Sequence, residues 1–599
     1  MNVNSPILDN YQLSDRYRRA SGRVFLTGTQ ALVRLPMLQR QLDLRDGLNT
    51  AGFISGYRGS PLGGYDQALW SAREFLDAHQ IQFMPAVNEE LAATAIMGTQ
   101  QVEGDPDSEV DGVFSIWYGK GPGVDRAGDA MKHGNAYGSS PHGGVLVIAG
   151  DDHGCVSSSM SHQSDVAFMT WFMPTLNPAS VQEYIEFGLF GFALSRFAGV
   201  WVGFKAISET VESAVSVTLH ELPEFQIPED FSVPETGLHY RWPDFPGPQV
   251  EARMVEKLHA VRAFARINPI DRRIYDVPDA RMGIITTGKG HFDLMEALAL
   301  LGIDEHRARN LGIDIYKVGM VWPLETAGAR AFLRGKKEVL VIEEKRGIIE
   351  SGLKESLYDF PGDKPQRMVG KYDEFGNPLV PWTGELNPTL LAPIVAARIT
   401  QEFPDVRFDA QLAGLAANGI DTTPVDHIQR RPYFCSGCPH NRSTKVPHGS
   451  KALAGIGCHF MASWMNRETE SLIQMGGEGV NWVGKSRFTG NKHIFQNLGE
   501  GTYFHSGSMA IRQALAANTN ITYKILFNDA VAMTGGQPVD GTLTVPGIAN
   551  QVRAEGVQRI AVVSDEPNKH RRQDFPEATS FHDRADLDTV QRELRDLPG

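Results

Sequence analysis

A chain of 599 residues is longer than one hydrophobic core usually supports, and a prior of about 150 residues per domain predicts roughly four structural units. Its composition, 42% hydrophobic and 21% charged, excludes a disordered, coiled-coil or collagen-like protein. The formal charge of −14 and the pI near 5.7 oppose general binding to nucleic acid or to anionic membranes.

Neither the N-terminus nor the most apolar stretch predicts export or membrane insertion. Residues 1–19 lack the basic start, apolar run and cleavage site of a signal peptide, so we expect a cytoplasmic protein. Residues 184–204 are strongly apolar, but Glu186 and Arg196 interrupt them, which favours a buried helix leading into a buried strand. Four cysteines in so long a chain exclude a disulfide scaffold and turn attention to metal binding.

Short apolar segments that stop at Gly, Asp or Asn recur along the chain. Their Val and Ile content is typical of parallel sheets covered by helices on both faces, whose ligands bind beyond the carboxyl ends of the strands. We therefore expect α/β layers. The predicted strands lie within residues 48–57, 144–150, 200–207, 282–288, 312–320, 338–344, 523–529 and 559–565.

Two proline-rich, weakly periodic stretches predict the domain boundaries. Residues 222–251 have the composition of a linker, and a second break spans residues 359–384. The predicted division is a domain at 1–225, a linker at 226–250, and domains at 251–400 and 401–599. The first and last domains are candidates for two related cofactor half-sites.

Three segments of the first domain carry candidate functional residues. A Gly-rich loop at residues 56–67 follows the first predicted strand, although a simple turn is the competing interpretation. Glu89 and Glu90 open an Ala-rich helix, where the helix dipole alone would favour acids. The polar loop at residues 150–165 contains His153 and Gln163, which a solvated loop explains nearly as well, and Cys155, which gets no role.

The strongest signal is a Gly-acid-Gly turn at Gly499, Glu500 and Gly501, followed by a predicted strand that ends at Asn528. Glycines let the backbone approach a diphosphate, and the acid and the Asn supply hard oxygens to Mg²⁺. The intervening residues suffice for one helix whose N-terminus faces the phosphates. A Gly-rich strand-to-helix turn without a ligand is the alternative.

This pattern resembles the thiamine diphosphate motif of 2-oxoacid:acceptor oxidoreductases, including the TGGQ sequence that follows. The resemblance implies Mg²⁺ ligands at Glu500, at the Asn528 side chain and at the Ala530 carbonyl, although the family has Asp at the position of Glu500. It also implies a set of cofactor-binding residues, which are Gly499, Gly501, Thr534, Gly535, Gly536, Gln537 and His459.

The same resemblance assigns roles in the first domain. An Asn-Glu-x-x-Ala pattern maps the glutamate that bonds the cofactor's aminopyrimidine onto Glu89. The Gly-rich loop is similar to the family loop that contacts the substrate carboxylate, through Arg58 or Ser60. The loop with His153 is similar to a pocket loop of the family.

Cys435 and Cys438 form a Cys-x-x-Cys pair, and Cys458 follows about 20 residues later. The resemblance implies a [4Fe-4S] cluster whose fourth ligand lies outside this sequence. Tetrahedral zinc with His440 or His459, and thiols without metal, remain open. In the middle domain, which resembles a transketolase C-terminal domain, Glu343 and Glu344 are expected to be a strand-end pair facing a domain interface.

The resemblance points to the large fused bacterial type of indolepyruvate:ferredoxin oxidoreductase. It implies an α/β fold, with two thiamine-diphosphate-binding doubly wound parallel-sheet domains and a transketolase C-terminal-like domain between them, the last one truncated. It implies oxidative decarboxylation of a 2-oxoacid, with aryl pyruvates favoured, electron transfer to ferredoxin and acyl transfer to coenzyme A. We expect a homo-oligomer that needs further domains or partner subunits, without nucleic acid or membrane partners. The competing hypotheses are a non-oxidative thiamine-dependent decarboxylase or ligase and a cofactor-free regulatory or structural paralogue.

Overall fold

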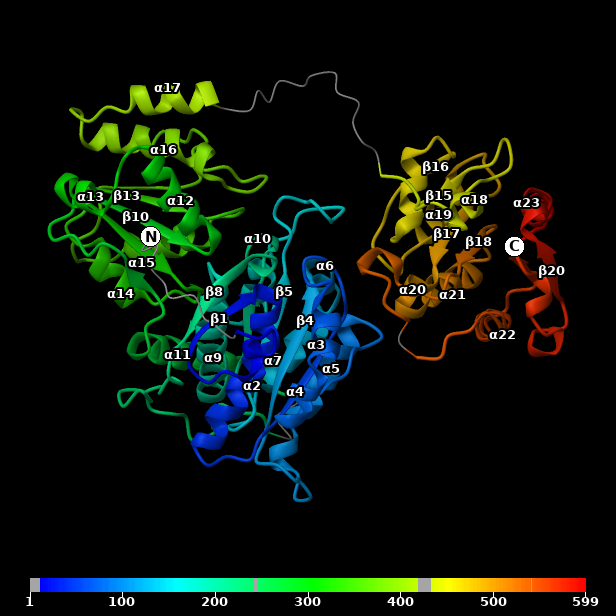
Figure 1. Cartoon of the computed structure of the whole chain (residues 1–599), viewed down its shortest axis with the longest axis horizontal. Helices are drawn as coiled ribbons and strands as arrows, with labels where there is room; N and C mark the ends of the chain where they lie inside the picture. Colours follow the sequence, from blue (N-terminus) through cyan, green and yellow to red (C-terminus); the bar gives the residue numbers. More distant parts are fainter. Residues whose placement is uncertain (1–10, 242–245, 419–431, 540) are drawn as a thin grey trace. The chain divides into compact units, whose positions relative to one another are not determined.

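The computed structural model describes residues 11–241, 246–418, 432–539 and 541–599 (Figure 1). The chain forms two compact units, Met1–Thr422 and Thr423–Gly599. The first unit contains both the predicted first domain and the predicted middle domain, and the second contains the Gly-Glu-Gly turn and the Cys-x-x-Cys pair.

A seven-stranded sheet forms the centre of the first unit. Its strand order is β12-β6-β7-β5-β4-β2-β3, and every neighbouring pair is parallel except β12 and β6. Three of the predicted strands, β2, β5 and β7, are confirmed. The strands are β2 (Ala51–Gly56), β3 (Ile81–Phe83), β4 (Val113–Lys120), β5 (Val145–Gly150), β6 (Thr175–Leu176), β7 (Trp201–Lys205) and β12 (Met320–Trp322).

Helices cover both faces of this sheet, as the apolar strands predicted. Successive side chains of a strand point to opposite faces, so a strand that is apolar throughout must be covered on both of them. Ile116 of β4 packs in the core shared with α2 and α9, whereas Trp117 packs in the core shared with α5 and α7. The main helices are α2 (Gly28–Arg45), α5 (Glu89–Thr99), α6 (Gly121–Arg126), α7 (Gly128–Tyr137), α9 (Val181–Ala198) and α11 (Gln249–Ile267). Shorter elements are α1 (Asp15–Arg18), α3 (Tyr65–Ser71), α4 (Arg73–Ala78), α8 (Ser164–Thr170) and α10 (Ser208–Val211), with an antiparallel pair of β1 (Gly22–Thr27) and β8 (Ala214–Leu219).

The apolar stretch at residues 184–204 is the predicted buried helix followed by a buried strand. Helix α9 ends at Gly199, whose left-handed φ of 66° turns the chain directly into β7. Gly188 lets α9 approach α2 closely, since a Cβ there would lie 2.3 Å from a methyl group of Leu35. Within the described ranges, no helix combines the length and the apolar character that a membrane span requires.

A five-stranded sheet of order β14-β13-β10-β11-β9 forms the rest of the first unit, parallel except at β9. Its strands are β9 (Arg272–Arg273), β10 (Met282–Thr287), β11 (Ile313–Val318), β13 (Glu338–Ile342) and β14 (Arg367–Val369). Its helices are α12 (Lys289–Leu300), α13 (Glu305–Leu311), α14 (Thr326–Leu333), α15 (Ile348–Tyr358), α16 (Pro388–Glu402) and α17 (Asp409–Asn418). The predicted strand at 312–320 divides at Gly319, and the following strand, β12, pairs with β6 of the first sheet. The two sheets are therefore interlocked.

The second unit contains a parallel sheet of order β16-β15-β17-β18 and a separate parallel pair, β19 and β20. The last two predicted strands are thus confirmed as β18 and β19, but they lie in different sheets. The strands are β15 (Ala452–Leu453), β16 (Thr469–Glu470), β17 (Phe495–Gly499), β18 (Thr522–Leu526), β19 (Ile560–Ser564) and β20 (Thr579–Asp583). The helices are α18 (His440–Ser443), α19 (Val480–Lys485), α20 (Glu500–Thr502), α21 (Ser508–Ala516), α22 (Val545–Glu555) and α23 (Leu587–Asp596).

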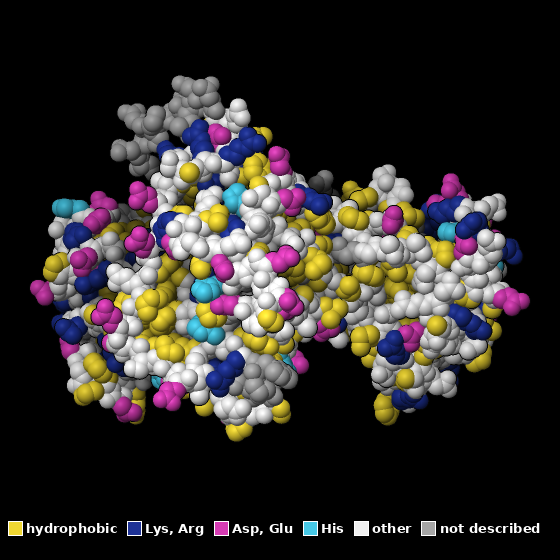
Figure 2. Space-filling view, turned by 90° about the horizontal axis from the view of Figure 1, so that it is seen from below, with side chains coloured by type: hydrophobic (Ala, Val, Ile, Leu, Met, Phe, Trp, Pro, Cys, Tyr) yellow, Lys and Arg dark blue, Asp and Glu magenta, His cyan; other side chains and the backbone are white. Residues whose placement is uncertain are grey.

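Charged side chains of both signs are interspersed over the face shown in Figure 2. The chain as a whole carries a net charge of −14.

Candidate functional site

Glu89 is a buried acid held at the start of a helix. It is the first residue of α5, and Asn88 caps the helix by accepting a hydrogen bond from the Leu91 N–H at 3.0 Å. Only 7% of Glu89 is exposed, and its carbonyl accepts a hydrogen bond from Trp117 Nε1 at 3.0 Å. The backbone at Glu89 is therefore fixed from both sides of the helix start.

Gly123 in α6 makes the space that the Glu89 carboxylate occupies. A Cβ at position 123 would lie 2.6 Å from Glu89 Cγ and 2.7 Å from Glu89 Oε1. We therefore expect Gly123→Ala to displace the carboxylate and to lower 2-oxoacid turnover by about 100-fold, the scale of a misplaced catalytic group. Steady-state kinetics measure the loss. Gly98→Ala in α5 is the matched control, because a Cβ there meets nothing within 4 Å; equal activity of the two variants would contradict the positioning role.

Arg58 is committed to a buried ion pair. Its Nε donates to Asp66 Oδ2 at 2.8 Å, and Tyr118 Oη donates to Asp66 Oδ1 at 2.6 Å. Arg58 is 3% exposed and Asp66 is fully buried. Asp66 thus orients the Arg58 side chain within the fold, whereas Ser60 is half-buried on the same loop.

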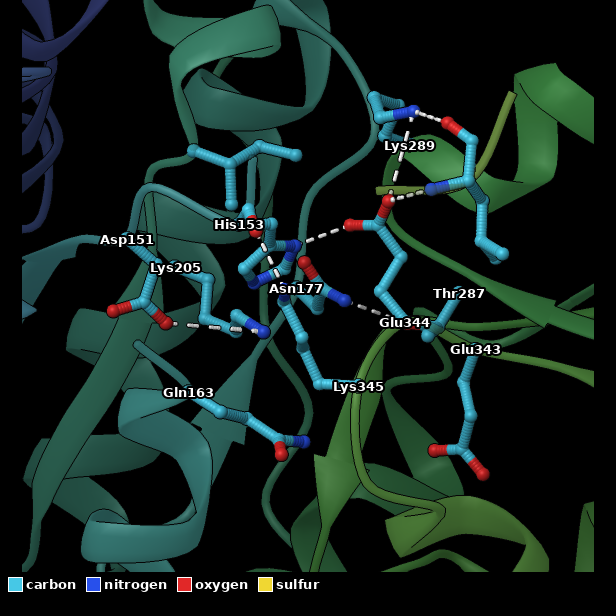
Figure 3. Close-up of polar contacts among 12 residues, drawn as sticks. Asp151, His153, Gln163, Asn177, Lys205, Thr287, Lys289, Glu343, Glu344 and Lys345 are labelled. Carbon is cyan, nitrogen blue, oxygen red and sulfur yellow. Dashed lines mark hydrogen bonds and ion pairs between the residues drawn. The ribbon is translucent and has the colours of Figure 1, made fainter. Parts of the chain in front are cut away.

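His153 lies where the two sheets of the first unit face each other (Figure 3). It follows β5, and its Nδ1 bonds the carboxylate of Glu344, which follows β13. Lys289 Nζ lies 3.6 Å from the same carboxylate, and the Leu386 N–H donates to Glu344 Oε1 at 2.8 Å. His153 Nε2 has no hydrogen-bond partner in the described part of the chain, and it borders a cavity with room for roughly one water molecule.

Of the acidic pair that follows β13, Glu344 faces this junction, which confirms the interface prediction for that residue. Glu343 accepts hydrogen bonds from the Ile348, Ile349 and Glu350 N–H groups at the start of α15. Burial raises the pKa of Glu343 to about 7 against these bonds. Gln163 also joins the junction, because it exchanges two hydrogen bonds with the backbone of Arg346.

Glu344 is expected to stabilise the first unit in a pH-dependent way. Burial raises its pKa, but the hydrogen bond from His153 and the charge of Lys289 outweigh burial and bring the pKa to about 2. We expect Glu344→Ala to cost about 3 kcal/mol of unfolding free energy at pH 7, because it removes the buried carboxylate that bonds His153 and the Leu386 N–H and faces Lys289. The folded-state pKa of Glu344 lies below its ordinary value of 4.5. The carboxylate therefore stabilises the folded state fully above pH 4.5, and this stabilisation is lost as the pH falls towards 2.

Urea unfolding of the full chain at pH 7 and at pH 3 measures this effect. The difference between wild type and Glu344→Ala should shrink at the lower pH. Glu296→Ala, at an exposed position of α12, is the control for loss of a carboxylate. An equal loss of stability at both pH values would contradict the ionic origin.

In the second unit, the Gly-Glu-Gly turn follows β17, and the segment with Asn528 follows the neighbouring strand β18. Glu500 is 3% exposed and accepts hydrogen bonds from the Asn528 N–H at 2.7 Å and the Ala530 N–H at 3.2 Å. Burial raises the pKa of Glu500, against these backbone bonds. The three residues predicted to hold Mg²⁺ therefore lie together at the carboxyl end of adjacent parallel strands.

Their oxygens fit a hard cation. The side-chain oxygen of Asn528 lies 2.7 Å from Glu500 Oε1 and 3.2 Å from the Ala530 carbonyl oxygen, and only a rotated amide would turn these contacts into hydrogen bonds. Adjacent ligands of octahedral Mg²⁺ lie about 2.9 Å apart at ordinary Mg–O distances. Without a metal ion, the rotated amide satisfies both contacts by donating from its NH₂ group; with Mg²⁺ bound, the amide oxygen would face Glu500 and the Ala530 carbonyl.

The TGGQ segment packs beside this cluster. Thr534 Oγ1 donates to Gln537 Oε1 at 2.7 Å, and the Val531 N–H donates to the Gln537 carbonyl at 2.8 Å, which closes a compact turn. Positive φ values at Gly535 and Gly536 permit that turn. A Cβ at Gly501 would lie 3.3 Å from Val531, so both parts of the motif are in contact.

Buried polar atoms without partners surround the Gly-Glu-Gly turn. His459 is 4% exposed, its Nε2 has no hydrogen bond within the described residues, and burial followed by the charge of His440 lowers its pKa to about 3. A Cβ at Gly499 would lie 3.3 Å from the His459 ring. Asn497 is fully buried on β17, and neither polar atom of its side chain has a described partner. A neutral His459 beside this turn fits the predicted cofactor role.

The three cysteines of the second unit are neighbours but do not form a closed metal site. Cys435 is exposed, while Cys438 and Cys458 are half-buried. Burial raises the pKa of Cys458, and the nearby Cys435 and Cys438 raise it further. Among the residues that the structure describes, no group of three His, Cys, Asp or Glu side chains is arranged to hold a metal ion. The iron–sulfur cluster stays a prediction.

Three residues of these sites escaped sequence reasoning. Gly123 has no motif of its own, and only its contact with Glu89 reveals it. Asn497 precedes the Gly-Glu-Gly turn by two residues. Because side chains alternate along β17, Asn497 lies on the same face of the sheet as position 499, and this spacing could have identified it. Glu478 is fully buried and accepts hydrogen bonds from the Ile456 and Gly476 N–H groups. Nothing in its local sequence indicated this.

Comparisons with known proteins agree on one family. Residues 272–418 match the model of the indolepyruvate oxidoreductase domain. The indolepyruvate oxidoreductase subunit IorA of Pyrococcus abyssi is 26% identical over 473 residues, covering 73% of this chain and 68% of that protein. The subunit of the same name from Methanothermobacter thermautotrophicus is 24% identical over 574 residues, covering 91% of this chain and 83% of that protein.

Among solved structures, a 2-oxoglutarate:ferredoxin oxidoreductase from Magnetococcus marinus aligns with a TM-score of 0.45 and 15% identity, over 63% of this chain and 66% of that chain. The family model covers β9 to α17, and the alignment with the Methanothermobacter subunit extends over nearly the whole sequence. The chain is therefore similar to indolepyruvate oxidoreductase subunits over most of its length, and its middle part matches the model of their domain.

Proposed function

We propose that this chain carries the thiamine-diphosphate site of an enzyme that oxidatively decarboxylates a 2-oxoacid. Aryl pyruvates such as indolepyruvate are the favoured substrates, ferredoxin takes the electrons and coenzyme A takes the acyl group. The observation that carries the proposal is the convergence of the Glu500, Asn528 and Ala530 oxygens beside a Gly-Glu-Gly turn. Similarity to indolepyruvate oxidoreductases supports the oxidative chemistry.

Bound thiamine diphosphate would supply a carbon nucleophile for the keto carbon and accept the electron pair that remains when CO₂ leaves. The chain's residues prepare this chemistry. Glu500, Asn528 and the Ala530 carbonyl offer oxygens to Mg²⁺, and the glycines at 499 and 501 give the backbone close access to phosphate. His459 remains neutral beside the turn because its burial disfavours the charged form.

Glu89 is the proposed partner of the aminopyrimidine ring. A buried carboxylate there holds the proton of a ring nitrogen and sets the tautomer of the cofactor. Ser60 has a hydroxyl donor for the substrate carboxylate, whereas Arg58 is engaged by Asp66 and stabilises the loop.

Cys435, Cys438 and Cys458 are the proposed ligands of an iron–sulfur cluster that accepts the electrons. A fourth ligand, further domains or subunits and a homo-oligomeric assembly belong to the same proposal. Iron analysis and an electron paramagnetic resonance spectrum of the reduced protein test the cluster separately from the thiamine site.

Anaerobic reduction of a redox dye tests the function directly. The full chain, loaded with thiamine diphosphate and Mg²⁺, should reduce the dye with indolepyruvate or another aryl pyruvate, and coenzyme A should accelerate the reaction. Release of aldehyde and CO₂ without dye reduction would replace the proposal with a non-oxidative decarboxylase. Absence of thiamine diphosphate binding in calorimetry would exclude both enzymatic functions.

A further inference from the structure

A large cavity lies in the second unit, away from the Gly-Glu-Gly turn. Its volume is about 600 Å³, and it opens between helix α23 and a segment that includes Cys438, one of the proposed cluster ligands. Arg442 and Lys445 line one side, and Arg584, Asp588 and Gln591 line the other. A cavity of this size is in the range of small-molecule sites, whereas a protein partner would need a much wider surface.

The lining is basic, although the whole chain carries a net charge of −14. Neither Arg442 nor Lys445 forms an ion pair among the described residues; the Arg442 guanidinium donates only to the Ala585 carbonyl, at 3.3 Å. Arg584 pairs with Asp565 at 2.6 Å. The carboxylate of Asp588 is neutralised by Arg592 at 2.7 Å. The cavity therefore has two uncompensated cations and no uncompensated anion in its described lining.

The segment that presents these cations is held in place. Arg467 donates to Thr444 Oγ1 at 2.7 Å, and Lys524 Nζ donates to the Lys445 carbonyl at 2.9 Å. Thr444 itself is fully buried. The backbone at positions 444 and 445 is therefore anchored to the sheet, and only the ends of the two cationic side chains need to move towards a ligand.

Gln591 gives a second, independent sign of a ligand. Gln591 lines the cavity from α23 and is only 4% exposed. Its Oε1 is buried and has no hydrogen-bond donor within the described residues. An unsatisfied buried acceptor is unfavourable, and a hydrogen bond from a bound molecule would satisfy it.

We propose that this cavity binds a nucleotide with at least two phosphates. The ends of Arg442, Lys445 and Arg584 would contact the phosphate oxygens, and Gln591 Oε1 would accept a hydrogen bond from an amino or hydroxyl group of the nucleoside. None of these residues belongs to the proposed Mg²⁺ site. Cys438, a proposed ligand of the iron–sulfur cluster, also lines the cavity, so the nucleotide would bind beside the proposed cluster.

Isothermal titration calorimetry on the full chain tests the site, with ADP and inorganic pyrophosphate as probes in metal-free buffer of low ionic strength. The double variant Arg442→Gln/Lys445→Gln should weaken both probes by about tenfold or more, because the loss of two cations removes charge-assisted hydrogen bonds. Gln591→Leu should weaken ADP by about threefold to tenfold and leave pyrophosphate unchanged, the effect of one hydrogen bond.

Two controls identify the site. Lys492→Gln removes an exposed cation elsewhere in the second unit and should leave both affinities unchanged. Asn528→Ala should also leave them unchanged, since it alters the proposed Mg²⁺ site. Equal melting temperatures of wild type and the Gln591 variant show that the fold is retained.

The following results would overturn the proposal. The wild type binds neither probe at millimolar concentration, or the double variant binds as tightly as the wild type. Dependence of ADP binding on Asn528 would assign the nucleotide to the other site. Equal weakening of ADP and pyrophosphate by Gln591→Leu would reject recognition of the nucleoside. A negatively charged protein that binds through Arg442 and Lys445 while both probes fail would place the site in a different class.

Discussion

Glu89→Gln is expected to lower the rate of 2-oxoacid-dependent dye reduction by about 10³-fold, within the range for loss of general acid–base catalysis. The amide has the shape of the acid but cannot exchange the proton of the aminopyrimidine in the same way. Glu89 is 7% exposed and begins a helix that Asn88 caps, so the isosteric change should leave the backbone in place. Circular dichroism and calorimetry with thiamine diphosphate would verify the fold and cofactor binding.

Glu90→Gln is the matched control for this variant. Glu90 is adjacent in the same helical turn, is partly exposed and lies 3.5 Å from Arg126. The loss of such a surface pair costs about 1 kcal/mol or less, so turnover should change little. Retained turnover in Glu89→Gln would remove that residue from the mechanism, and equal losses in the two variants would point to the helix start rather than to the carboxylate.

Asn528→Ala is expected to weaken Mg²⁺-dependent binding of thiamine diphosphate by about 100-fold, the upper end of the range for altered metal-site support. The substitution removes one of three converging oxygens and leaves in place the backbone N–H that Glu500 accepts. Calorimetry with and without Mg²⁺ measures the effect. The metal dependence separates a ligand from a residue that only supports the loop.

Asn491→Ala, at an exposed position of the same unit, controls for the loss of an amide. Unchanged cofactor affinity in Asn528→Ala would favour the other orientation of the Asn528 amide, in which its NH₂ group bonds Glu500 and the Ala530 carbonyl. The cluster would then be a hydrogen-bonded turn without metal, and the cofactor-free paralogue would gain support.

Strand positions were predictable because local patterns encode them. All eight segments rich in Val and Ile form strands, since buried parallel strands require apolar side chains on both faces. β4 was missed, although it is fully buried along most of its length, because Ser115 and Gly119 dilute its apolar pattern. Predicting a single strand at 312–320 was incomplete for a different reason: Gly319 separates two strands that pair in different sheets.

Side-chain partners were much less predictable. The resemblance assigned Arg58 or Ser60 to the substrate carboxylate, and nothing in the sequence indicated that Arg58 pairs with Asp66. The resemblance placed His153 in a pocket loop, and nothing in the sequence indicated that His153 bonds Glu344, a residue 191 positions away. Residue type limits which groups a side chain can bond. Whether another residue of the protein bonds that side chain depends on contacts between distant segments.

The sequence by itself determined the α/β class and eight strand-forming segments, and its resemblance to a known family grouped Glu500, Asn528 and Ala530, because these depend on residue type and local pattern. The pairing of β17 with β18, which brings the three residues together, was decided by the tertiary structure. Only the tertiary structure decided that the first two sheets are interlocked through β12, that Gly123 makes room for Glu89, and that Gln591 borders a basic cavity. Those features arise where segments far apart in the chain come into contact, and burial and the pairing of charges there depend on packing rather than on local sequence.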